Sequence, residues 1–483
     1  MKKVAFHNLG CKVNAYEMEL MQQNFTKNGF EIVPFSEKAD IYIINTCTVT
    51  NIADRKSRQM LHRAKALNPE ALVVAAGCYV ETDREGAAAD EAIDLIIGNK
   101  EKPDIVKIVS SALNETRAGF PVHDGTESDE RTVPVSYPLE RLTDHTRAYI
   151  KIQDGCDQYC SYCIIPFARG HVESRDEDET IREITDLAAA GCREFVITGI
   201  HLSSYGLDRS YNIAAKDGSF SNTALTGIIK KISGIKGVER IRLGSLEPRI
   251  ITEDFLEEMA SLKEFCPHFH LSLQSGSDTV LKRMNRRYDT AEYYDKVQLI
   301  RRFFGHPAIT TDIITGFPGE TEEEFRETRE FLKKVDFYET HVFAYSRRRG
   351  TAADKMPGQH TQKTKNDRSR ILIEDSDKRA RRFRDYYIGR ETELLIEECA
   401  DIDGRYCGVG YNREYVRIAM ELPGVARAEE NKEGIHTDSS DVSKPTGSPD
   451  TRVGGSMAGR IVKGIGKMML DPETLLISRA PES

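Results

Sequence analysis

Three closely spaced cysteines are the residues of this sequence best suited to metal chemistry. Cys156, Cys160 and Cys163 are separated by three and two intervening residues. The apolar run at 148–152, which is typical of a strand, leads directly into them. Iron–sulfur clusters are held by cysteine thiolates, and a cubane cluster usually takes four of them. Three thiolates on one loop can therefore hold one face of a cluster and leave one iron open to a small molecule.

Structural zinc and simple core packing both remain open as alternatives for this motif. Structural zinc takes a closed set of four ligands, typically from paired CxxC arrangements. The sequence has no second CxxC pair, and the nearest downstream histidine is His171. Three unrelated core cysteines are the second alternative, because free cysteine is often a small buried hydrophobe.

The residues around the motif resemble a known enzyme family. A CxxxCxxC run after a strand is similar to the cluster motif of the radical S-adenosylmethionine enzymes, and residues 151–156 and 163–170 resemble the methylthiotransferases among them. The resemblance implies that Cys156, Cys160 and Cys163 are catalytic and hold a [4Fe–4S] cluster. The open iron would bind the amino and carboxylate groups of S-adenosylmethionine. The similarity is greatest to the branch that modifies threonylcarbamoyladenosine at position 37 of tRNA, beside the anticodon.

Length and composition agree with a cytoplasmic, multi-domain protein. The 483 residues predict about three domains. Ten cysteines in so long a chain do not make a disulfide scaffold, and their clustering favours metal chemistry in a reducing compartment. The N-terminus has no sustained apolar region, and no apolar run approaches the roughly 18 residues that a spanning helix needs. We therefore expect no secretory signal, no membrane partner and a cytoplasmic location.

The charge distribution permits RNA binding at one place. The net charge is −9, but affinity for nucleic acid comes from a local basic surface. Residues 362–390 contain ten Lys or Arg against five Asp or Glu, a net charge of +5, with interleaved aromatic residues. Such a helix could grip phosphates and stack on bases, or could simply present a solvated face.

A second set of cysteines is predicted from topology. Cys11, Cys47 and Cys78 each come just after a strand-like run. Because the carboxyl ends of parallel strands meet at one edge of a sheet, the three thiolates should gather there, unless their placement is a coincidence. Residues 10–14, 45–50 and 77–79 resemble family motifs whose cysteines hold an auxiliary [4Fe–4S] cluster. The strand-like runs lie at 3–6, 41–44 and 72–76, with helical patterns at about 15–27, 52–67 and 82–92.

The central part of the chain predicts a parallel barrel. Six strand patterns alternate with helical patterns, and the cysteine loop follows the first strand, at the edge where such barrels place their sites. Radical S-adenosylmethionine enzymes have a six-unit partial barrel, which agrees. The strands are expected at 148–153, 194–198, 239–243, 268–273, 309–314 and 338–343, and the helices at about 178–190, 225–235, 253–264, 290–302 and 320–334.

The ends of the later strands supply candidate contacts to S-adenosylmethionine. Glycines there let the backbone approach a ligand, and carboxylate or amide oxygens can accept hydrogen bonds from ammonium or ribose hydroxyl groups. Arg169 could bind a carboxylate or phosphate bidentately, or it could be a structural loop residue. His201, His341, Cys192 and Cys266 are interpreted as structural. The candidate cofactor contacts are Gly199, Glu247, Gln274, Gly316 and Arg169.

The C-terminal part reads as a small β-barrel. Short strand-like runs at 393–397, 406–410, 415–419 and 474–478 are separated by turn signals, and 459–463 is a further candidate strand. By resemblance this is a TRAM domain, an OB-like barrel that binds tRNA. The predicted fold class is therefore α/β. It comprises an N-terminal parallel α/β domain (1–112), a linker (113–145), a radical S-adenosylmethionine partial (β/α)6 barrel (146–385), and a small β-barrel (386–483) with a disordered insert at about 425–457.

The resemblance implies an enzyme that replaces a C–H bond by C–S–CH3 at C2 of N6-threonylcarbamoyladenosine in tRNA. It implies two [4Fe–4S] clusters, S-adenosylmethionine, a one-electron reductant such as flavodoxin or ferredoxin, and a sulfur donor. The same chemistry on isopentenyladenosine in tRNA or on a ribosomal protein is an alternative. A non-catalytic iron–sulfur carrier is another, but it leaves the barrel loops unexplained.

Overall fold

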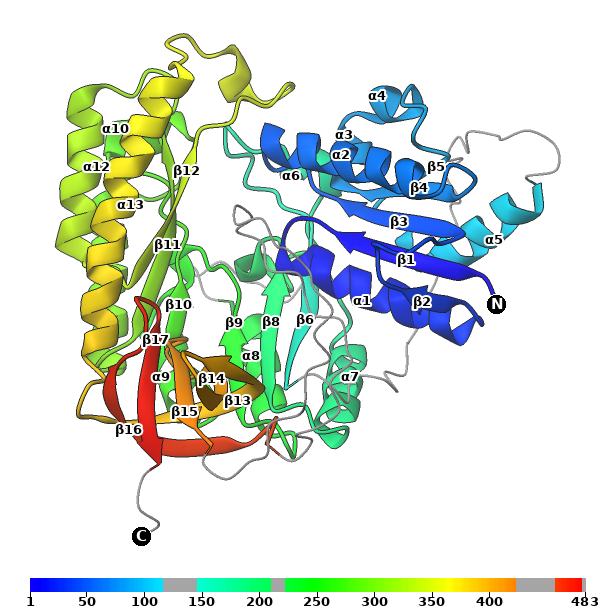
Figure 1. The fold of residues 1–483 in the computed structure, drawn as a ribbon. Coiled ribbons are helices and arrows are strands. Elements are labelled where there is room, and N and C mark those ends of the chain that lie inside the picture. The colour runs from blue at the N-terminus through cyan, green and yellow to red at the C-terminus, as the bar shows by residue number, and fades with distance from the viewer. Residues whose placement is uncertain (116–145, 210–221, 423–456, 480–483) are drawn as a thin grey trace. The chain divides into compact units, whose positions relative to one another are not determined.

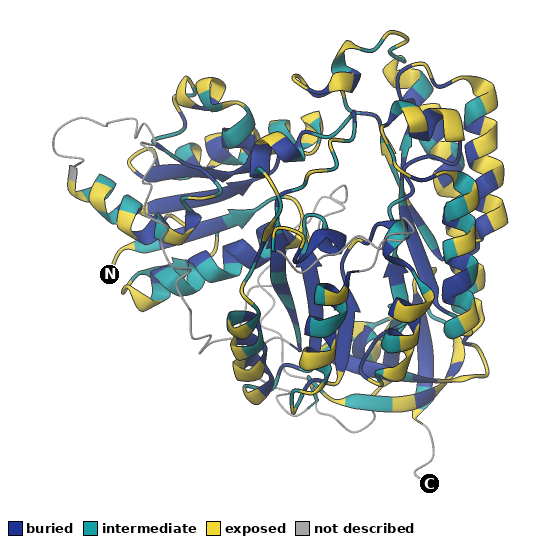
Figure 2. Cartoon of the chain, turned by 180° about the vertical axis from the view of Figure 1, so that it is seen from behind, coloured by how far each residue is buried: buried dark blue, intermediate teal, exposed yellow. Residues whose placement is uncertain are grey.

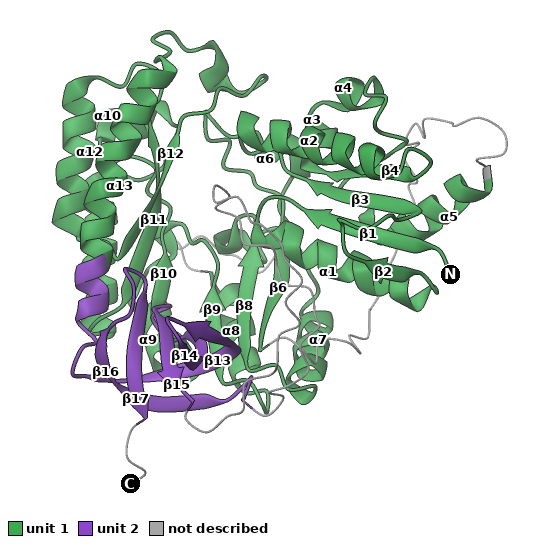
Figure 3. Cartoon of the chain, in the orientation of Figure 1, with its two compact units in different colours: residues 1–380 green, residues 381–483 purple. Residues whose placement is uncertain are grey.

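The computed structural model describes residues 1–115, 146–209, 222–422 and 457–479 (Figure 1). The chain divides into two compact units, Met1–Ala380 and Arg381–Ser483 (Figure 3). Within the described ranges, no helix is both long enough and apolar enough to cross a bilayer. The predicted linker and insert lie almost wholly outside these ranges.

The first unit begins with a five-stranded parallel sheet. Its order is β2 (Glu31–Val33), β1 (Lys3–Asn8), β3 (Ile41–Thr46), β4 (Leu72–Gly77) and β5 (Leu95–Ile97). The three predicted strands are confirmed, and β2 and β5 are additional short edge strands. Chain order reverses at β1, which lies between β2 and β3, and such a switch point is where open α/β sheets bind ligands.

Apolar residues on both faces of this sheet explain why helices cover both sides. Successive residues of one strand, such as Ile41 and Tyr42, belong to separate hydrophobic cores. Helices α1 (Lys12–Lys27) and α5 (Ile105–Glu115) pack on the first core, and α2 (Asn51–Leu67), α3 (Cys78–Thr82) and α4 (Arg84–Ala88) on the second. The predicted helix at 82–92 is wrong in its extent, because Asp83 leaves helical geometry and caps α4 through the Gly86 N–H.

Six parallel strands follow in succession and form the predicted partial barrel. Strands β6 (Arg147–Asp154), β8 (Glu194–Gly199) and β9 (Arg240–Leu243) pair in one sheet, with the short antiparallel β7 (Glu173–Ser174) at its edge. Strands β10 (His268–His270), β11 (Ala308–Thr315) and β12 (Glu339–Ala344) form another. Single parallel bridges at 241–265 and 246–271 connect β9 to the β10 segment. Figure 2 shows the strands largely buried.

Helices pack on the outer face of these strands. Five of them begin at a residue whose side chain accepts a hydrogen bond from the backbone three positions on, as good N-caps do. These are α7 (Glu177–Ala189), α8 (Thr223–Ser233), α9 (Glu253–Ser261), α11 (Thr290–Phe303) and α12 (Glu322–Val335), close to their predicted bounds. Further elements are α6 (Ile165–Arg169), α10 (Asp278–Arg283), α13 (Gln362–Asp385) and the 3₁₀ helices Lys102–Asp104, Leu202–Ser204, Pro248–Ile250 and Ala352–Lys355.

The second unit is a closed β-barrel, as predicted. Its strands follow the order β13 (Glu391–Ile402), β14 (Arg405–Tyr411), β15 (Arg417–Glu421), β17 (Thr474–Arg479) and β16 (Ile461–Met469). Neighbours are antiparallel except β15 and β17. Cys407, Val409 and Ala419 form part of its small core, so Cys407 packs as a hydrophobic residue.

Candidate active site

The topology brings the N-terminal cysteines together at one edge of the five-stranded sheet. Cys47 and Cys78 each follow one member of the register pair Thr46–Gly77, at the ends of β3 and β4. Cys11 is the N-cap of α1, just past β1. Gly10 has φ +106°, and a Cβ atom there would lie 2.9 Å from the Cys47 Sγ. The loop that carries Cys11 therefore lies directly against Cys47. We call Cys11, Cys47 and Cys78 the auxiliary triad.

Cys47 and Cys78 are buried and Cys11 is exposed, and the environment of Cys47 is unsuited to a free thiolate. Burial raises the pKa of Cys47 to about 11, and charge on Cys78 or Cys11 would raise it further. Asn99 Nδ2 lies 3.7 Å from the Cys78 Sγ, a hydrogen-bond contact to sulfur. A bound metal reverses this preference, because a coordinating thiol is deprotonated. Three mutually close cysteines with polar support thus suit a metal centre.

The second triad, Cys156, Cys160 and Cys163, lies on the loop after β6, and we call it the barrel triad. The loop starts at Gly155, where φ is +66° and an added Cβ would approach the His171 carbonyl oxygen to 1.8 Å. The Cys156 N–H then donates to the Gly170 carbonyl at 3.1 Å. Only glycine fits this close backbone crossing. The loop is also tied to the end of α10, because the Ser161 N–H donates to the Met284 carbonyl at 3.0 Å.

A half-buried arginine supports the barrel triad. Arg286 Nη1 donates to the Cys160 Sγ at 3.2 Å, and its Nε donates to the Tyr288 hydroxyl at 2.9 Å. Burial raises the pKa of Cys156 to about 11 and that of Cys163 to about 12, so a cation beside the loop favours the thiolate form that metal binding needs. Arg286 is absent from the residues predicted from sequence, although an arginine-rich run after the Gln274 loop is a visible signal.

Each triad offers three free cysteines, the donor type that iron–sulfur clusters take. No group of three or more His, Cys, Asp and Glu side chains surrounds one point as a single metal ion requires, within the part of the chain that the structure describes. Cysteines that bind a cubane cluster each take a different iron, so they need not converge on one point. All ten cysteines are free, which leaves both triads available.

Gly199, at the end of β8, contributes indirectly to the barrel triad. It pairs in register with Gln153, and a Cβ at Gly199 would lie 2.8 Å from the Gln153 Oε1. The Gln153 amide donates to the Gly155 carbonyl at 2.8 Å and accepts from the His201 N–H at 2.7 Å. The missing side chain at Gly199 therefore makes room for Gln153, which supports the cysteine loop.

Glu247, Gln274 and Gly316 lie at successive strand ends, as predicted. The buried Glu247 carboxylate accepts from Arg249 at 2.6 and 3.0 Å. Gln274 has φ 72° and its backbone bonds both Asp312 and Ile314 of β11, while its side-chain amide has no hydrogen-bond partner among the described residues. Gly316 has φ +66°, and its N–H donates to Glu320 at 2.8 Å. Of the three, Gln274 offers the most free bonding capacity.

Arg169 is buried and already bonded to protein. Its Nη1 contacts Glu17 Oε1 at 2.9 Å and Asp154 Oδ2 at 2.9 Å, and its Nη2 donates to Asn14 Oδ1 at 2.7 Å. The bidentate recognition of carboxylates expected of this arginine is thus directed at protein side chains. These contacts argue against the predicted contact with S-adenosylmethionine.

The face of the barrel strands that points away from the helices is polar. His270 contacts Thr310 at 2.9 Å and Asp312 at 3.2 Å, and the His341 ring lies 5.7 Å from the His270 ring. Lys12, in the first turn of α1, is exposed yet close to this face. Desolvation is the main cause that lowers the pKa of Lys12, and Arg147 and Arg242 lower it further. Asp312 and Glu194 raise it. These charged neighbours place Lys12 near the polar barrel face, and the face suits a polar ligand.

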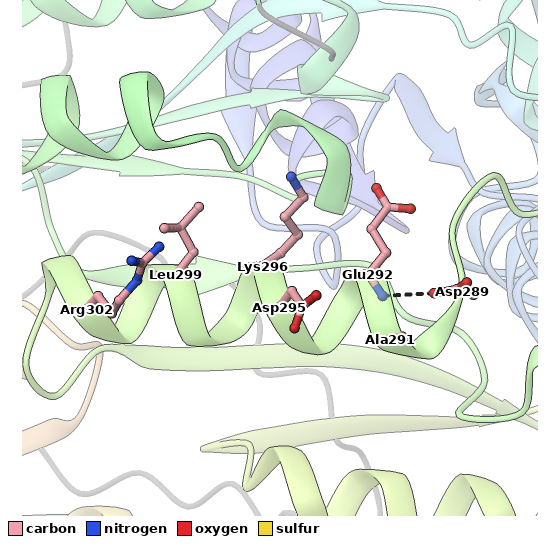
Figure 4. A pocket seen from close by; sticks show the side chains of 7 residues that line it. All are labelled: Asp289, Ala291, Glu292, Asp295, Lys296, Leu299 and Arg302. Carbon is pink, nitrogen blue, oxygen red and sulfur yellow. Dashed lines mark hydrogen bonds between the residues drawn. The ribbon is translucent and has the colours of Figure 1, made fainter. Parts of the chain in front are cut away.

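A separate surface hollow of about 480 Å³ lies along α11 (Figure 4). It is lined by charged residues, and Asp289 accepts from the Glu292 N–H at 2.8 Å as the cap of this helix. None of the predicted site residues lines it, and we assign it no role. Its lining residues are Asp289, Ala291, Glu292, Asp295, Lys296, Leu299 and Arg302.

Comparisons with known proteins agree with this arrangement of sites. The chain matches the family model described as Radical SAM superfamily over residues 150–332 and that of uncharacterized protein family UPF0004 over residues 3–98. The two matches contain the barrel triad and the auxiliary triad, respectively. It is also similar in fold, at a TM-score of 0.50 and 17% identity over 71% of this chain and 73% of the other, to the radical S-adenosylmethionine methyltransferase TsrM from Kitasatospora setae.

Relatives of greater similarity span nearly the whole chain. A threonylcarbamoyladenosine tRNA methylthiotransferase MtaB from Bacillus subtilis is 38% identical over 87% of this chain and 91% of its own length. The protein of that name from Aquifex aeolicus is 38% identical over 82% and 93%. A tRNA-2-methylthio-N(6)-dimethylallyladenosine synthase from Pelotomaculum thermopropionicum is 30% identical over 82% and 87%.

Proposed function

The chain belongs to the methylthiotransferases of the radical S-adenosylmethionine superfamily, and from this premise we propose that it methylthiolates C2 of N6-threonylcarbamoyladenosine at position 37 of tRNA. The family predicted from the cysteine motifs is thus confirmed. The observation that carries the proposal is the pair of cysteine triads at the carboxyl ends of parallel strands within one compact unit.

Each triad is assigned one [4Fe–4S] cluster. Cys156, Cys160 and Cys163 would leave one iron for S-adenosylmethionine, and the auxiliary triad would hold the second cluster. When bound, these groups supply the one-electron cleavage of S-adenosylmethionine and the transfer of sulfur and methyl. The protein supplies orientation: Arg286 stabilises the Cys160 thiolate, and the Gln274 amide, which no described side chain pairs, can hold polar groups of the cofactor.

The polar barrel face supports the choice of nucleoside. A threonylcarbamoyl substituent carries a carboxylate, a hydroxyl and a urea, whereas a dimethylallyl substituent is apolar. Lys12 can pair with the carboxylate, while His270, Asp312 and His341 offer further hydrogen-bonding groups. The greater identity to the relatives named for threonylcarbamoyladenosine points the same way. Isopentenyladenosine in tRNA remains the second candidate.

We further propose the partners that this chemistry needs. The reaction requires a one-electron reductant, such as a flavodoxin or ferredoxin, and a sulfur donor. The basic helix α13 and the C-terminal β-barrel are assigned to binding tRNA, by phosphate contacts and by analogy with OB-like barrels, respectively. Ten free cysteines support work in the reducing cytoplasm.

The test is nucleoside mass spectrometry of tRNA after anaerobic incubation. Reconstituted protein receives S-adenosylmethionine, a reductant and tRNA bearing either threonylcarbamoyladenosine or isopentenyladenosine. A methylthio adduct on the first nucleoside is expected. Adduct on the second nucleoside alone would overturn the nucleoside assignment. Formation of 5′-deoxyadenosine with neither adduct would direct the search to ribosomal proteins, and absence of 5′-deoxyadenosine would favour an iron–sulfur carrier.

A further inference from the structure

A buried arginine connects the segments that carry the two triads. Arg169 follows Cys163 by six residues, in α6. Its partner Asp154 precedes Cys156 by two residues, and its partners Asn14 and Glu17 lie in the first two turns of α1, which starts directly after Cys11. Figure 1 shows α1 beside β6 and β8 of the barrel, which it contacts. The Arg169 guanidinium thus contacts residues next to both triads.

The charges around Arg169 form a closed, buried network. Glu17 Oε2 also accepts from Lys102 Nζ at 2.5 Å, and Glu17 Oε1 accepts from Lys151 Nζ at 2.8 Å. Although burial opposes it, Lys102, Lys151 and Arg169 hold the pKa of Glu17 well below its ordinary value. Such buried networks contribute little net stability, because the cost of desolvating the charges offsets their mutual attraction. They nevertheless tolerate few alternative geometries.

The other two auxiliary loops have their own contacts to the barrel. After Cys47, Asn51 accepts from Arg348 at 2.9 Å, and Thr48 and Asp54 contact the same guanidinium. Beside Cys78, Asn99 donates both to that cysteine's sulfur at 3.7 Å and to the Ala168 carbonyl at 2.9 Å. Ala168 is the neighbour of Arg169. The three segments that carry the auxiliary cysteines are therefore each tied to the barrel by a different contact.

We infer that Arg169 is a positioning residue that fixes the Cys11 side of the auxiliary triad, carried by α1, relative to the barrel triad. This inference rests on the proposed function, since a substrate between the triads must meet both. A lysine could keep the charge, but it could not reach Glu17, Asp154 and Asn14 together in the fixed geometry of a guanidinium. Loss of the guanidinium contacts should leave the barrel triad intact and disturb the placement of α1 and Cys11 relative to it.

The experiment compares wild type, Arg169→Lys and Arg169→Gln as reconstituted proteins. Arg329→Lys is the control, because Arg329 forms an ion pair with Asp375 between α12 and α13, within the barrel. Two quantities are measured: methylthio product formed per 5′-deoxyadenosine, and hydrogen exchange of α1. Misplacement of reacting groups by about 1 Å can cost about 100-fold. We expect a loss of about tenfold or more in the product ratio, with formation of 5′-deoxyadenosine retained, and faster exchange of α1 for both Arg169 variants but not for Arg329→Lys.

The outcomes separate the inference from the proposed function. If wild type forms no methylthio product on any tRNA, the proposed function fails. The hydrogen-exchange rate of α1 in the Arg169 variants then decides by itself whether Arg169 holds α1 to the barrel. Unchanged exchange together with an unchanged product ratio in Arg169→Lys would overturn the inference. If Arg169→Gln loses iron, the decision passes to Arg169→Lys, which keeps the charge.

Discussion

Arg286 Nη1 lies 3.2 Å from the Sγ of Cys160, so a half-buried cation contacts the middle cysteine of the barrel triad. The same guanidinium lies 4.9 Å from the centre of the Tyr288 ring, which holds it in place. Groups that hydrogen-bond to metal ligands fix their orientation and adjust the affinity for the metal. The contact joins the segment after α10 to the cysteine loop, although the two partners are 126 residues apart in sequence.

Replacing Arg286 by Gln should weaken the barrel cluster while sparing the auxiliary one. The variant lacks the charge that favours the Cys160 thiolate, and loss of such a supporting contact typically costs about 10- to 100-fold in metal affinity or activity. We expect lower iron retention on chelator challenge and slower formation of 5′-deoxyadenosine. Iron content and cleavage rates equal to wild type would contradict a supporting role for Arg286.

Single cysteine variants should separate the two triads. Cys160→Ala is expected to abolish cleavage of S-adenosylmethionine, and Cys47→Ala to retain cleavage while losing methylthio product, because the two sites use different loops. Cys192→Ala is the matched control, since Cys192 is buried near the Thr146 carbonyl and belongs to neither triad. Product formed at the wild-type level by Cys47→Ala, measured by nucleoside mass spectrometry, would argue against the auxiliary cluster.

Local pattern and topology are sufficient to predict much of the fold. Apolar runs such as 41–44 and 72–76 mark strands that are buried on both faces, and their order places Cys47 and Cys78 after register neighbours. The edge strands β2 and β5 escape prediction because each spans three residues. A run this short carries too few positions for a periodic pattern.

Contacts between distant segments cannot be predicted in the same way. The sequence marks Arg169 as a residue that could bind a carboxylate of the cofactor or serve as a structural loop residue, but its partners Glu17 and Asp154 depend on how α1 packs against the barrel. Arg286 reaches Cys160 across a sequence separation of 126 residues, and nothing local in either segment specifies that contact. The sequence therefore indicates which residues carry chemistry, and tertiary packing determines which residues position them.

Lys12→Gln should reduce discrimination for a carboxylate-bearing nucleoside. If the ammonium pairs with the threonylcarbamoyl carboxylate, its loss removes a charge-assisted contact and should lower kcat/KM about tenfold or more, mostly through KM. Activity on isopentenyladenosine, if any, should not fall. Lys236→Gln, an exposed lysine in the loop that precedes β9, is the control. Binding affinities of wild type and Lys12→Gln for an anticodon stem-loop with and without the threonylcarbamoyl carboxylate give an independent measure. An equal loss of affinity for both stem-loops in Lys12→Gln would exclude this role.

Gly155→Ala should damage the barrel triad through the backbone. The added methyl would lie 1.8 Å from the His171 carbonyl oxygen, and φ at this position is +66°. A side chain at residue 155 is therefore disfavoured both by the steric clash and by the left-handed backbone conformation. We expect a lower melting temperature and loss of iron from the barrel triad. Gly227→Ala is the matched control in α8, where no atom lies within 4 Å of the added carbon. That variant should be stabilised by about 0.5–1 kcal/mol, because alanine favours the helix.

Glu19 should make stability depend on pH near neutrality. Burial, with a contribution from Glu183, raises the pKa of Glu19 from 4.5 to about 7. The folded state thus holds this proton more tightly than the unfolded state, so the favourable contribution is complete below about pH 4.5 and is lost as pH rises through about 7. Glu19→Gln should match wild type near pH 4.5 and exceed it by about 1–2 kcal/mol near pH 8. Melting temperatures across this range test the prediction, with the exposed Glu330→Gln as control. A constant difference between wild type and Glu19→Gln at both ends of the range would show that the carboxyl group titrates alike in the folded and unfolded chains.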